Sequence, residues 1–131
     1  MPDLAALLRI LDEFEIEYII IGGAAMVLAG SSRLTQDLDV LYRRSSENLE
    51  RLAAALRRAN ARLRVLHEPA GVPLSLDAQT LNMGMNFTLL TDRGDLDIFG
   101  QIPGIGKYED ALPLREEYVL LEGARPMRTL G

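Results

Sequence analysis

The sequence predicts an α/β fold of the α+β kind, with a small mixed β-sheet, helices packed on one face and an acidic site on the other. Leucines recur at helical spacing near the N-terminus. Short β-branched or alternating segments end at glycines or turn residues. Two apolar segments near residues 86–99 flank a glycine-containing turn, which is typical of a β-hairpin. Helices and strands that follow one another along the chain favour a sheet covered by helices.

The N-terminal third predicts a helix, a strand and a second short helix. Asp3 is a suitable N-cap, and the leucines that follow it form one apolar stripe: Leu4, Leu7, Leu8 and Leu11. Residues 17–21 are rich in isoleucine and stop at Gly22-Gly23, as expected for a buried strand. Residues 24–29 then favour a short buried helix that Gly30 closes.

The central part predicts a strand, a long helix and a further strand. Asp37–Tyr42 begins with alternating polar and apolar residues, which is typical of a half-buried strand. Leu49, Leu52 and Leu56 then lie on one face of a helix. Arg62–Leu66 favours another strand, and the proline and glycine of Glu68–Pro73 predict a loop.

The C-terminal part predicts two hairpins. Asn86–Thr91 and Asp95–Phe99 flank the turn Asp92-Arg93-Gly94. Residues 101–110 are expected to form a loop. A last hairpin is expected to run through residues 118–121, turn at Glu122-Gly123 and return through residues 125–129.

Composition limits the classes of function. The 131 residues fit a single domain, and we expect one domain over residues 1–131. A net charge of −5 argues against extensive binding of duplex nucleic acid. The chain has no cysteine and one histidine, which excludes thiolate and histidine-cluster zinc sites. No apolar run reaches the ~20 residues of a membrane helix, and no signal peptide is visible, so we expect a cytoplasmic protein without a membrane partner.

The motif Asp37-Leu38-Asp39 is the first candidate site. Residues two apart on a strand share one face, so the two carboxylates are expected side by side. Such neighbours repel each other, and divalent cations between them remove the repulsion. The alternative is an acidic pair at a strand edge that faces water, which the motif alone does not exclude.

Asp97 adds a third acid within a strand, in Leu96-Asp97-Ile98. Aspartate is a poor strand former, so two such interruptions in one small domain need an explanation. If the two strands are neighbours, Asp37, Asp39 and Asp97 meet on one face of the sheet. Asp95 competes for the third position, but it directly follows a turn, where aspartate is common.

Gly22-Gly23 is a candidate phosphate-binding turn. Glycines between a strand and a helix expose backbone N–H groups at the positive end of the helix. An ordinary strand-to-helix turn is the alternative. Arg33 and Thr35 lie just ahead of the acidic strand, and Arg33 is placed to steady a triphosphate or to remain a solvated loop residue.

Taken together, Ile21-Gly22-Gly23, Asp37–Val40 and Leu96–Ile98 resemble the signature of the DNA polymerase β-like nucleotidyltransferase superfamily. The wider segments around them resemble its small bacterial members, many of which belong to toxin–antitoxin or phage-defence modules. Those proteins usually continue into a C-terminal helical segment that often carries lysines near the nucleotide. The present sequence stops at Gly131, and its one lysine is Lys107.

The resemblance implies a role for each matching residue. Gly22 and Gly23 would hold the β- and γ-phosphates of a nucleoside triphosphate. Asp37 and Asp39 would ligate two Mg²⁺ ions, and Asp97 would ligate the catalytic one and accept the proton of the attacking hydroxyl.

The expected function is therefore metal-dependent transfer of a nucleoside monophosphate to a hydroxyl on a protein, a tRNA or a small molecule. A partner protein is a further expectation. The alternative is a non-catalytic module of the same fold that binds a nucleotide or a partner. The arginines between Arg43 and Arg64 are expected either to be solvated or to contact an RNA acceptor or an acidic partner.

Overall fold

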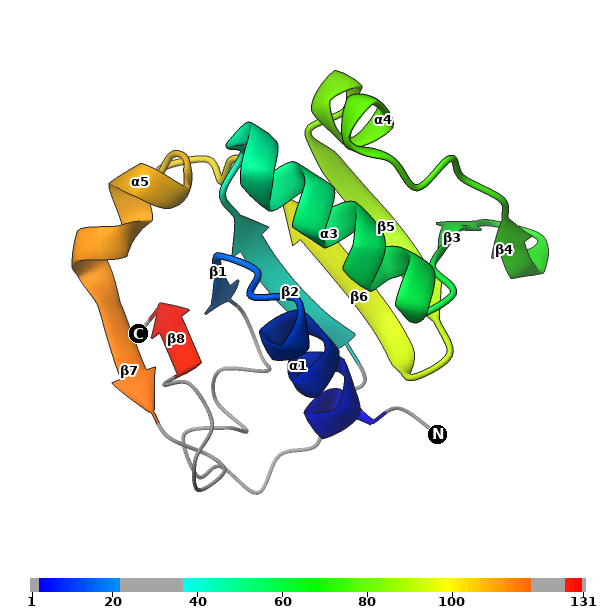
Figure 1. The fold of residues 1–131 in the computed structure, drawn as a ribbon, viewed down its shortest axis with the longest axis horizontal. Helices are drawn as coiled ribbons and strands as arrows, with labels where there is room; N and C mark the ends of the chain where they lie inside the picture. The colour runs from blue at the N-terminus through cyan, green and yellow to red at the C-terminus, as the bar shows by residue number, and fades with distance from the viewer. Residues whose placement is uncertain (1–2, 22–36, 119–126, 131) are drawn as a thin grey trace.

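A computed structural model describes residues 3–21, 37–118 and 127–130, and these residues form one mixed sheet with helices packed against it (Figure 1). The eight strands have the order β4-β3-β5-β6-β2-β1-β8-β7. Their bounds are β1 Tyr18–Ile21, β2 Asp37–Tyr42, β3 Arg62–Val65, β4 Glu68–Val72, β5 Asn86–Thr91, β6 Gly94–Phe99, β7 Arg115–Tyr118 and β8 Met127–Leu130. The helices are α1 Leu4–Glu13, α3 Ser46–Arg58, α4 Ala78–Met83, α5 Tyr108–Ala111 and the 3₁₀ turn η1 Leu112–Leu114. The predicted fold class is confirmed.

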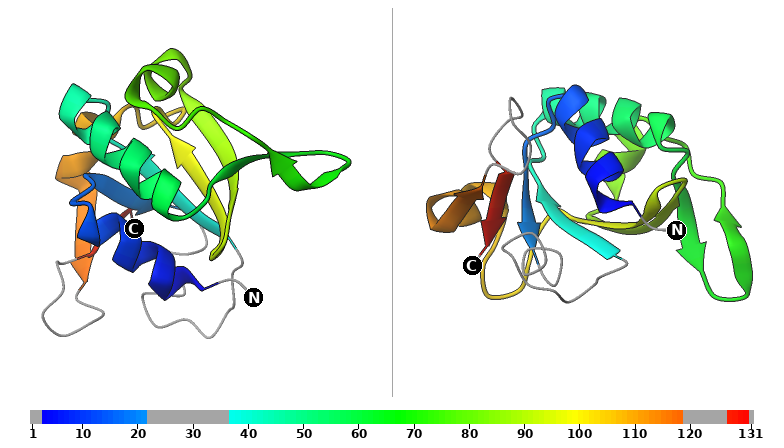
Figure 2. Two further views of the ribbon diagram at one scale, coloured as in Figure 1. Left: turned by 45° about the vertical axis from the view of Figure 1, so that its right-hand side comes forward. Right: turned by 90° about the horizontal axis from the view of Figure 1, so that it is seen from below.

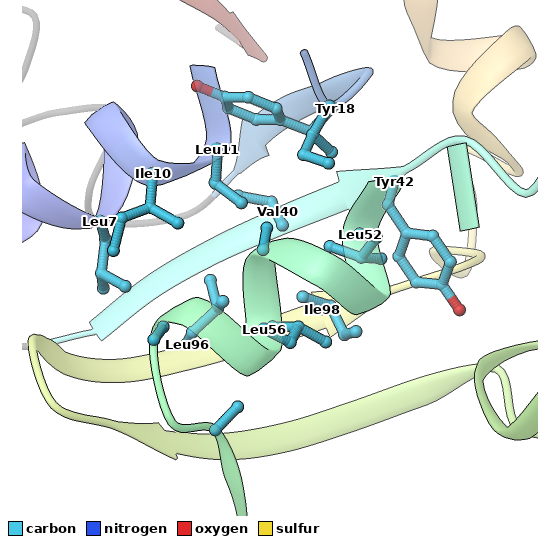
Figure 3. Close-up of a cluster of buried hydrophobic side chains, with 14 of the residues drawn as sticks. Leu7, Ile10, Leu11, Tyr18, Val40, Tyr42, Leu52, Leu56, Leu96 and Ile98 are labelled. Carbon is cyan, nitrogen blue, oxygen red and sulfur yellow. The ribbon is translucent and has the colours of Figure 1, made fainter. Parts of the chain in front are cut away.

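Helices α1 and α3 form a layer on one face of the sheet, as Figure 2 shows from below. The predicted N-cap is present, because the Asp3 side chain accepts a hydrogen bond from the Ala6 N–H at 3.0 Å. The buried residues of the two helices pack against the strands beneath them (Figure 3). Those facing β2 and β6 include Leu7, Ile10, Leu11, Leu52 and Leu56, which meet Val40, Leu96 and Ile98.

Asn48, on the first turn of α3, ties this helix to the strands. Its side chain is completely buried. Its Oδ1 accepts a hydrogen bond from the Glu17 N–H at 2.7 Å, and its Nδ2 donates to the Glu17 and Arg43 carbonyls at 3.1 and 2.7 Å. These carbonyls and this N–H flank β1 and β2, so one amide bonds to three backbone groups, of which the Glu17 carbonyl also accepts from the Arg43 N–H at 3.1 Å.

Helix α4 is short, and Arg44 bonds to its C-terminal end. The Arg44 guanidinium donates to the carbonyls of Gly84 and Asn82, both at 2.9 Å, at the C-terminal end of α4. It also donates to the Tyr42 hydroxyl at 2.7 Å, and this hydroxyl donates to the Met85 carbonyl at 2.7 Å. Burial raises the pKa of Tyr42, although Arg44 opposes this, so the hydroxyl keeps its proton and remains a donor at neutral pH.

Replacing Arg44 with methionine is expected to lower the free energy of unfolding by about 2 kcal/mol, because hydrogen bonds from a charged donor are lost while the carbonyls stay in place. Arg58→Met is the matched control, since Arg58 is exposed on α3. Urea denaturation measures both variants. Equal midpoints for the two would show that Arg44 does not hold α4.

The hairpin β5–β6 forms as predicted. Thr91 pairs with Gly94, and Gly94 has a φ of 122°, which disfavours other residues. The Thr91 hydroxyl donates to the Gly94 carbonyl at 2.6 Å and accepts from the Arg93 N–H at 3.0 Å. The turn therefore fixes the register of β6, which carries Asp95 and Asp97.

The prediction of a loop over Glu68–Pro73 is wrong, because β4 forms an edge strand there. An edge position tolerates Pro69. Gly71 has a φ of 77°, and a Cβ at this position would lie 2.9 Å from both the Leu63 carbonyl oxygen and the Arg62 Cβ. The glycine that indicated a loop instead permits close approach to β3.

The predicted loop over residues 101–110 is partly wrong, since α5 begins at Tyr108. The last hairpin exists as β7 and β8, but its first strand begins earlier than predicted, at Arg115, and residues 119–126 lie outside the described part. The helix predicted over residues 24–29 also lies outside it. Among the described helices, none has the length and apolar character that a bilayer crossing requires.

Candidate functional site

Two acidic residues lie directly opposite each other at the centre of the sheet. Strands β2 and β6 are parallel neighbours, and their register pairs Asp39 with Asp97. Paired residues on neighbouring strands share one face and lie about 5 Å apart. The same register pairs Asp37 with Asp95, two residues earlier on each strand. The predicted adjacency of the two acidic strands is therefore present in the fold.

The pattern of buried residues determines which face the acids occupy. Leu38 and Val40 alternate with Asp39, and they are no more than 1% exposed beneath α1 and α3. Leu96 and Ile98 flank Asp97 in the same way. Because strand side chains alternate, Asp39 and Asp97 point away from these two helices. The expectation of helices on one face and acids on the other holds at this point of the sheet.

A second, smaller apolar cluster lies on the same face as Asp39, Asp95 and Asp97, which together are called the acidic row. Ile19 and Leu41 pack there against Tyr108 and Ala111 of α5. Leu41 follows Asp39 by two residues on β2, so α5 covers the end of the strand next to the acids. Burial raises the pKa of the Tyr108 hydroxyl, which keeps it neutral at this end. The acidic row therefore has a buried apolar cluster on one side.

The structure brings some of the predicted site residues together and leaves others outside its described part. Asp39 and Asp97 meet, and Asp37 takes its backbone place on β2 while its side chain lies outside the described part. Gly22, Gly23, Arg33 and Thr35 also lie outside it. Ile21, which precedes Gly22 in the sequence, has Asp39 as its partner on β2.

Arg64 is the site residue that the sequence did not single out. Its Nη2 lies 3.0 and 3.2 Å from the two carboxylate oxygens of Asp97, and its Nη1 lies 3.0 Å from Asp95 Oδ2. The Asp97 side chain is only 14% exposed, so this contact is partly shielded from water. The guanidinium thus bridges two acids of β6 from β3, across the intervening strand β5.

A signal for Arg64 was present but could not be used without the strand order. Arg62, Leu63 and Arg64 alternate on β3, and Leu63 packs against the main core. Alternation therefore places both arginines on the acidic face. The sequence alone does not say that β3 lies within reach of β6.

The arginines of α3 that were expected either to be solvated or to contact an acceptor or an acidic partner lie elsewhere. Arg51 and Arg57 belong to α3, on the face opposite the acids. Arg51 lies 3.7 Å from Glu17, and Arg57 donates to the Leu76 carbonyl. An acceptor that used these two side chains would not reach the acidic row.

The donor set suits a hard divalent cation, because carboxylate oxygens are the ligands that Mg²⁺ and Mn²⁺ prefer. Two carboxylates about 5 Å apart repel each other by about 3 kcal/mol at an effective dielectric constant of about 20. The pair therefore favours a cation beside it. Among the described side chains, which exclude that of Asp37, no group of three acids or histidines has the geometry of a metal site. Arg64 supplies positive charge on the Asp97 side.

Comparisons with known proteins add no family assignment. Models of protein families gave no match to the chain, and neither curated proteins nor solved structures gave one. Function is therefore inferred from the geometry of the acidic row and from the residues around it.

Proposed function

We propose that this chain is a metal-dependent nucleotidyltransferase, which moves a nucleoside monophosphate from a nucleoside triphosphate to a hydroxyl acceptor. One observation carries the proposal: Asp39 and Asp97 face each other on adjacent parallel strands, on the face that α1 and α3 leave open. Aspartates inside apolar strands lower the stability of the strands, and their role as ligands of a shared cation would account for their presence there. The resemblance of the glycine and aspartate motifs to those of the nucleotidyltransferase superfamily supports the same function.

Asp37, Asp39 and Asp97 have distinct roles in this proposal. Asp37 and Asp39 hold the cations together with Asp97. Asp97 also accepts the proton of the acceptor hydroxyl, whose oxygen bonds to the α-phosphorus as the bond to the β-phosphate oxygen breaks. Pyrophosphate leaves. Bound Mg²⁺ would supply the charge that lets a triphosphate approach this acidic face and that stabilises the leaving group.

The residues outside the described part complete the proposed site. Gly22 and Gly23 would contact the phosphates, and they follow the strand residue that pairs with Asp39. Arg33 and Thr35 precede β2 in sequence and would contact the nucleotide. The acceptor is a protein, a tRNA or a small molecule, and a toxin–antitoxin or defence module is the proposed setting.

A test follows the α-phosphate. The purified chain is incubated with Mg²⁺, cell extract and each of the four nucleoside triphosphates, labelled on either the α- or the γ-phosphate. We expect label on protein, RNA or a small molecule from the α-labelled nucleotide and none from the γ-labelled one, because the monophosphate is what moves. Transfer of the γ-label instead would indicate a kinase, and no α-transfer with any nucleotide contradicts the proposed activity.

A non-catalytic nucleotide-binding or partner-binding module is the second candidate. It is favoured by one observation, the contact of Arg64 with both oxygens of the residue proposed as general base. A module of this kind would bind a Mg²⁺–nucleotide complex in equilibrium dialysis but leave no label on any acceptor.

A further inference from the structure

We propose that Arg64 is an internal counter-cation of the acidic row, which competes with divalent metal ions for Asp97 and so regulates their binding. The inference rests on the proposed function. It concerns the ion pairing of that site before metal and nucleotide bind. It is supported by the position of the guanidinium, by the irregular strand that carries it and by the charge balance of the row.

The guanidinium occupies the oxygens that a metal ion would need. Arg64 Nη2 reaches both oxygens of Asp97, at 3.0 and 3.2 Å, while Nη1 reaches Asp95 at 3.0 Å. Hydrogen bonds between a guanidinium and a carboxylate are charge-assisted and roughly twice as strong as neutral ones. A carboxylate engaged on both oxygens has to release at least one of them before it can ligate a cation.

The backbone of β3 is irregular at Arg64, which affects the direction of its side chain. The paired register of β3 with β5 consists of Arg62 and Leu63 and does not extend to Arg64. The register between β3 and β4 shifts between Leu63 and Val65, which places Arg64 at an irregularity of the strand. Bulges of this kind redirect side chains and occur often next to active sites. Beyond this point the β3–β4 hairpin projects from the sheet (Figure 2).

The cluster of Arg64, Asp95 and Asp97 is partly exposed at its outer edge. The Arg64 and Asp95 side chains are 32% and 34% exposed, whereas Asp97 is 14% exposed and Arg64 Nη1 itself is buried. The Asp95 side of the contact, with both side chains about one third exposed, is expected to contribute little to stability. The main effect of the guanidinium is to place a positive charge against Asp97, which opposes the approach of a second cation.

The charge balance gives the direction of the effect. With Arg64 in place, the row of Asp39, Asp95 and Asp97 has a compensating positive charge beside it. Removing that charge leaves the carboxylates more negative and releases the Asp97 oxygens from the guanidinium. Metal affinity should therefore rise when Arg64 becomes neutral, although a residue that merely supported the fold would leave it unchanged or lower it.

The test measures binding of Mn²⁺ alone, from the electron paramagnetic resonance signal of the free ion. We expect Arg64→Gln to bind Mn²⁺ about tenfold more tightly than the parent chain, an effect that corresponds to one nearby unit charge partly screened by water. Arg64→Lys keeps the charge but has one nitrogen in place of the two that contact Asp95 and Asp97, so its affinity should fall between the two. Far-ultraviolet circular dichroism shows that each variant is folded.

Arg62→Gln is the matched control. Arg62 lies two residues earlier on the same strand and bonds to the Ala70 carbonyl at 2.8 Å instead of to the row. The variant removes the same charge, and we expect its Mn²⁺ affinity to stay within about twofold of the parent, because the Arg62 guanidinium lies against Asp92 and the Ala70 carbonyl and its charge acts mainly there. An equal gain in both glutamine variants would show a general charge effect and overturn the specific role of Arg64.

Two further outcomes separate this inference from the proposed function. If the parent chain binds Mn²⁺ and Asp39→Asn abolishes the binding, but Arg64→Gln and Arg64→Lys bind no more tightly than the parent, the inference is wrong and the metal site stands. If neither the parent nor Arg64→Gln binds Mn²⁺, the metal site itself is wrong, and the role of Arg64 falls with it.

Discussion

Asp39→Asn is expected to lower the rate of nucleotide transfer by about a thousandfold or more, because ~4 kcal/mol of transition-state stabilisation corresponds to a factor of that size. Asparagine keeps the shape of the side chain and removes the charge. Asp39 pairs with Asp97 of β6 and follows Asp37 by two residues on β2, so it is the acid placed to share cations with both of these residues. Transfer of α-label under saturating Mg²⁺ measures the effect.

Glu50→Gln is the matched control for this variant. It makes the same change of carboxylate to amide on the exposed surface of α3, which lies on the opposite face of the sheet. We expect its transfer rate to equal that of the parent. Because Asp39 lies in an acidic row, its loss should leave the melting temperature near the parent value. An Asp39→Asn variant that is folded and transfers at the parent rate would falsify the proposed role.

Asn48→Ala should produce the largest loss of stability among the variants considered, about 3 kcal/mol. The substitution removes three hydrogen bonds: the Glu17 N–H and the Arg43 carbonyl lose this partner, while the Glu17 carbonyl keeps its bond from the Arg43 N–H. Each orphaned buried backbone group costs about 1–3 kcal/mol, and partial access of water reduces the sum. For a domain of this size, the melting temperature should fall by roughly 10 °C.

Differential scanning calorimetry checks this expectation. Glu50→Ala, two residues further along the same helix and exposed, controls for the change in helix propensity and should shift the melting temperature little. If Asn48→Ala melts within a degree or two of Glu50→Ala, the amide does not carry the connection between α3 and the strands.

The sequence predicted those parts of the fold whose signal is local. The leucine stripe of α1 and the apolar face of α3 follow the helical period, and the alternation in Asp37–Tyr42 indicated the bounds of β2. The hairpin β5–β6 followed from Gly94 in its turn. These signals are local because hydrophobic periodicity and turn chemistry act over a few residues.

Short elements escaped prediction because tertiary contacts create them. Helix α4 packs into the core through Leu81, and Arg44, just after β2, donates to the carbonyls at its C-terminal end. Strand β4 is an edge strand with a proline and a glycine, and its pairing with β3 overrides its weak strand propensity. A short segment has little propensity of its own, so distant partners decide its structure.

By itself, the sequence determined that Asp39 and Asp97 stand inside apolar strands and that each points away from its buried neighbours. Only the tertiary structure decided that these strands are parallel neighbours in a register that sets the two acids opposite each other. It alone also decided that Arg64 crosses β5 to reach Asp97. The physical reason is that alternation fixes the face of a side chain locally, whereas strand order and register result from the packing of the whole core.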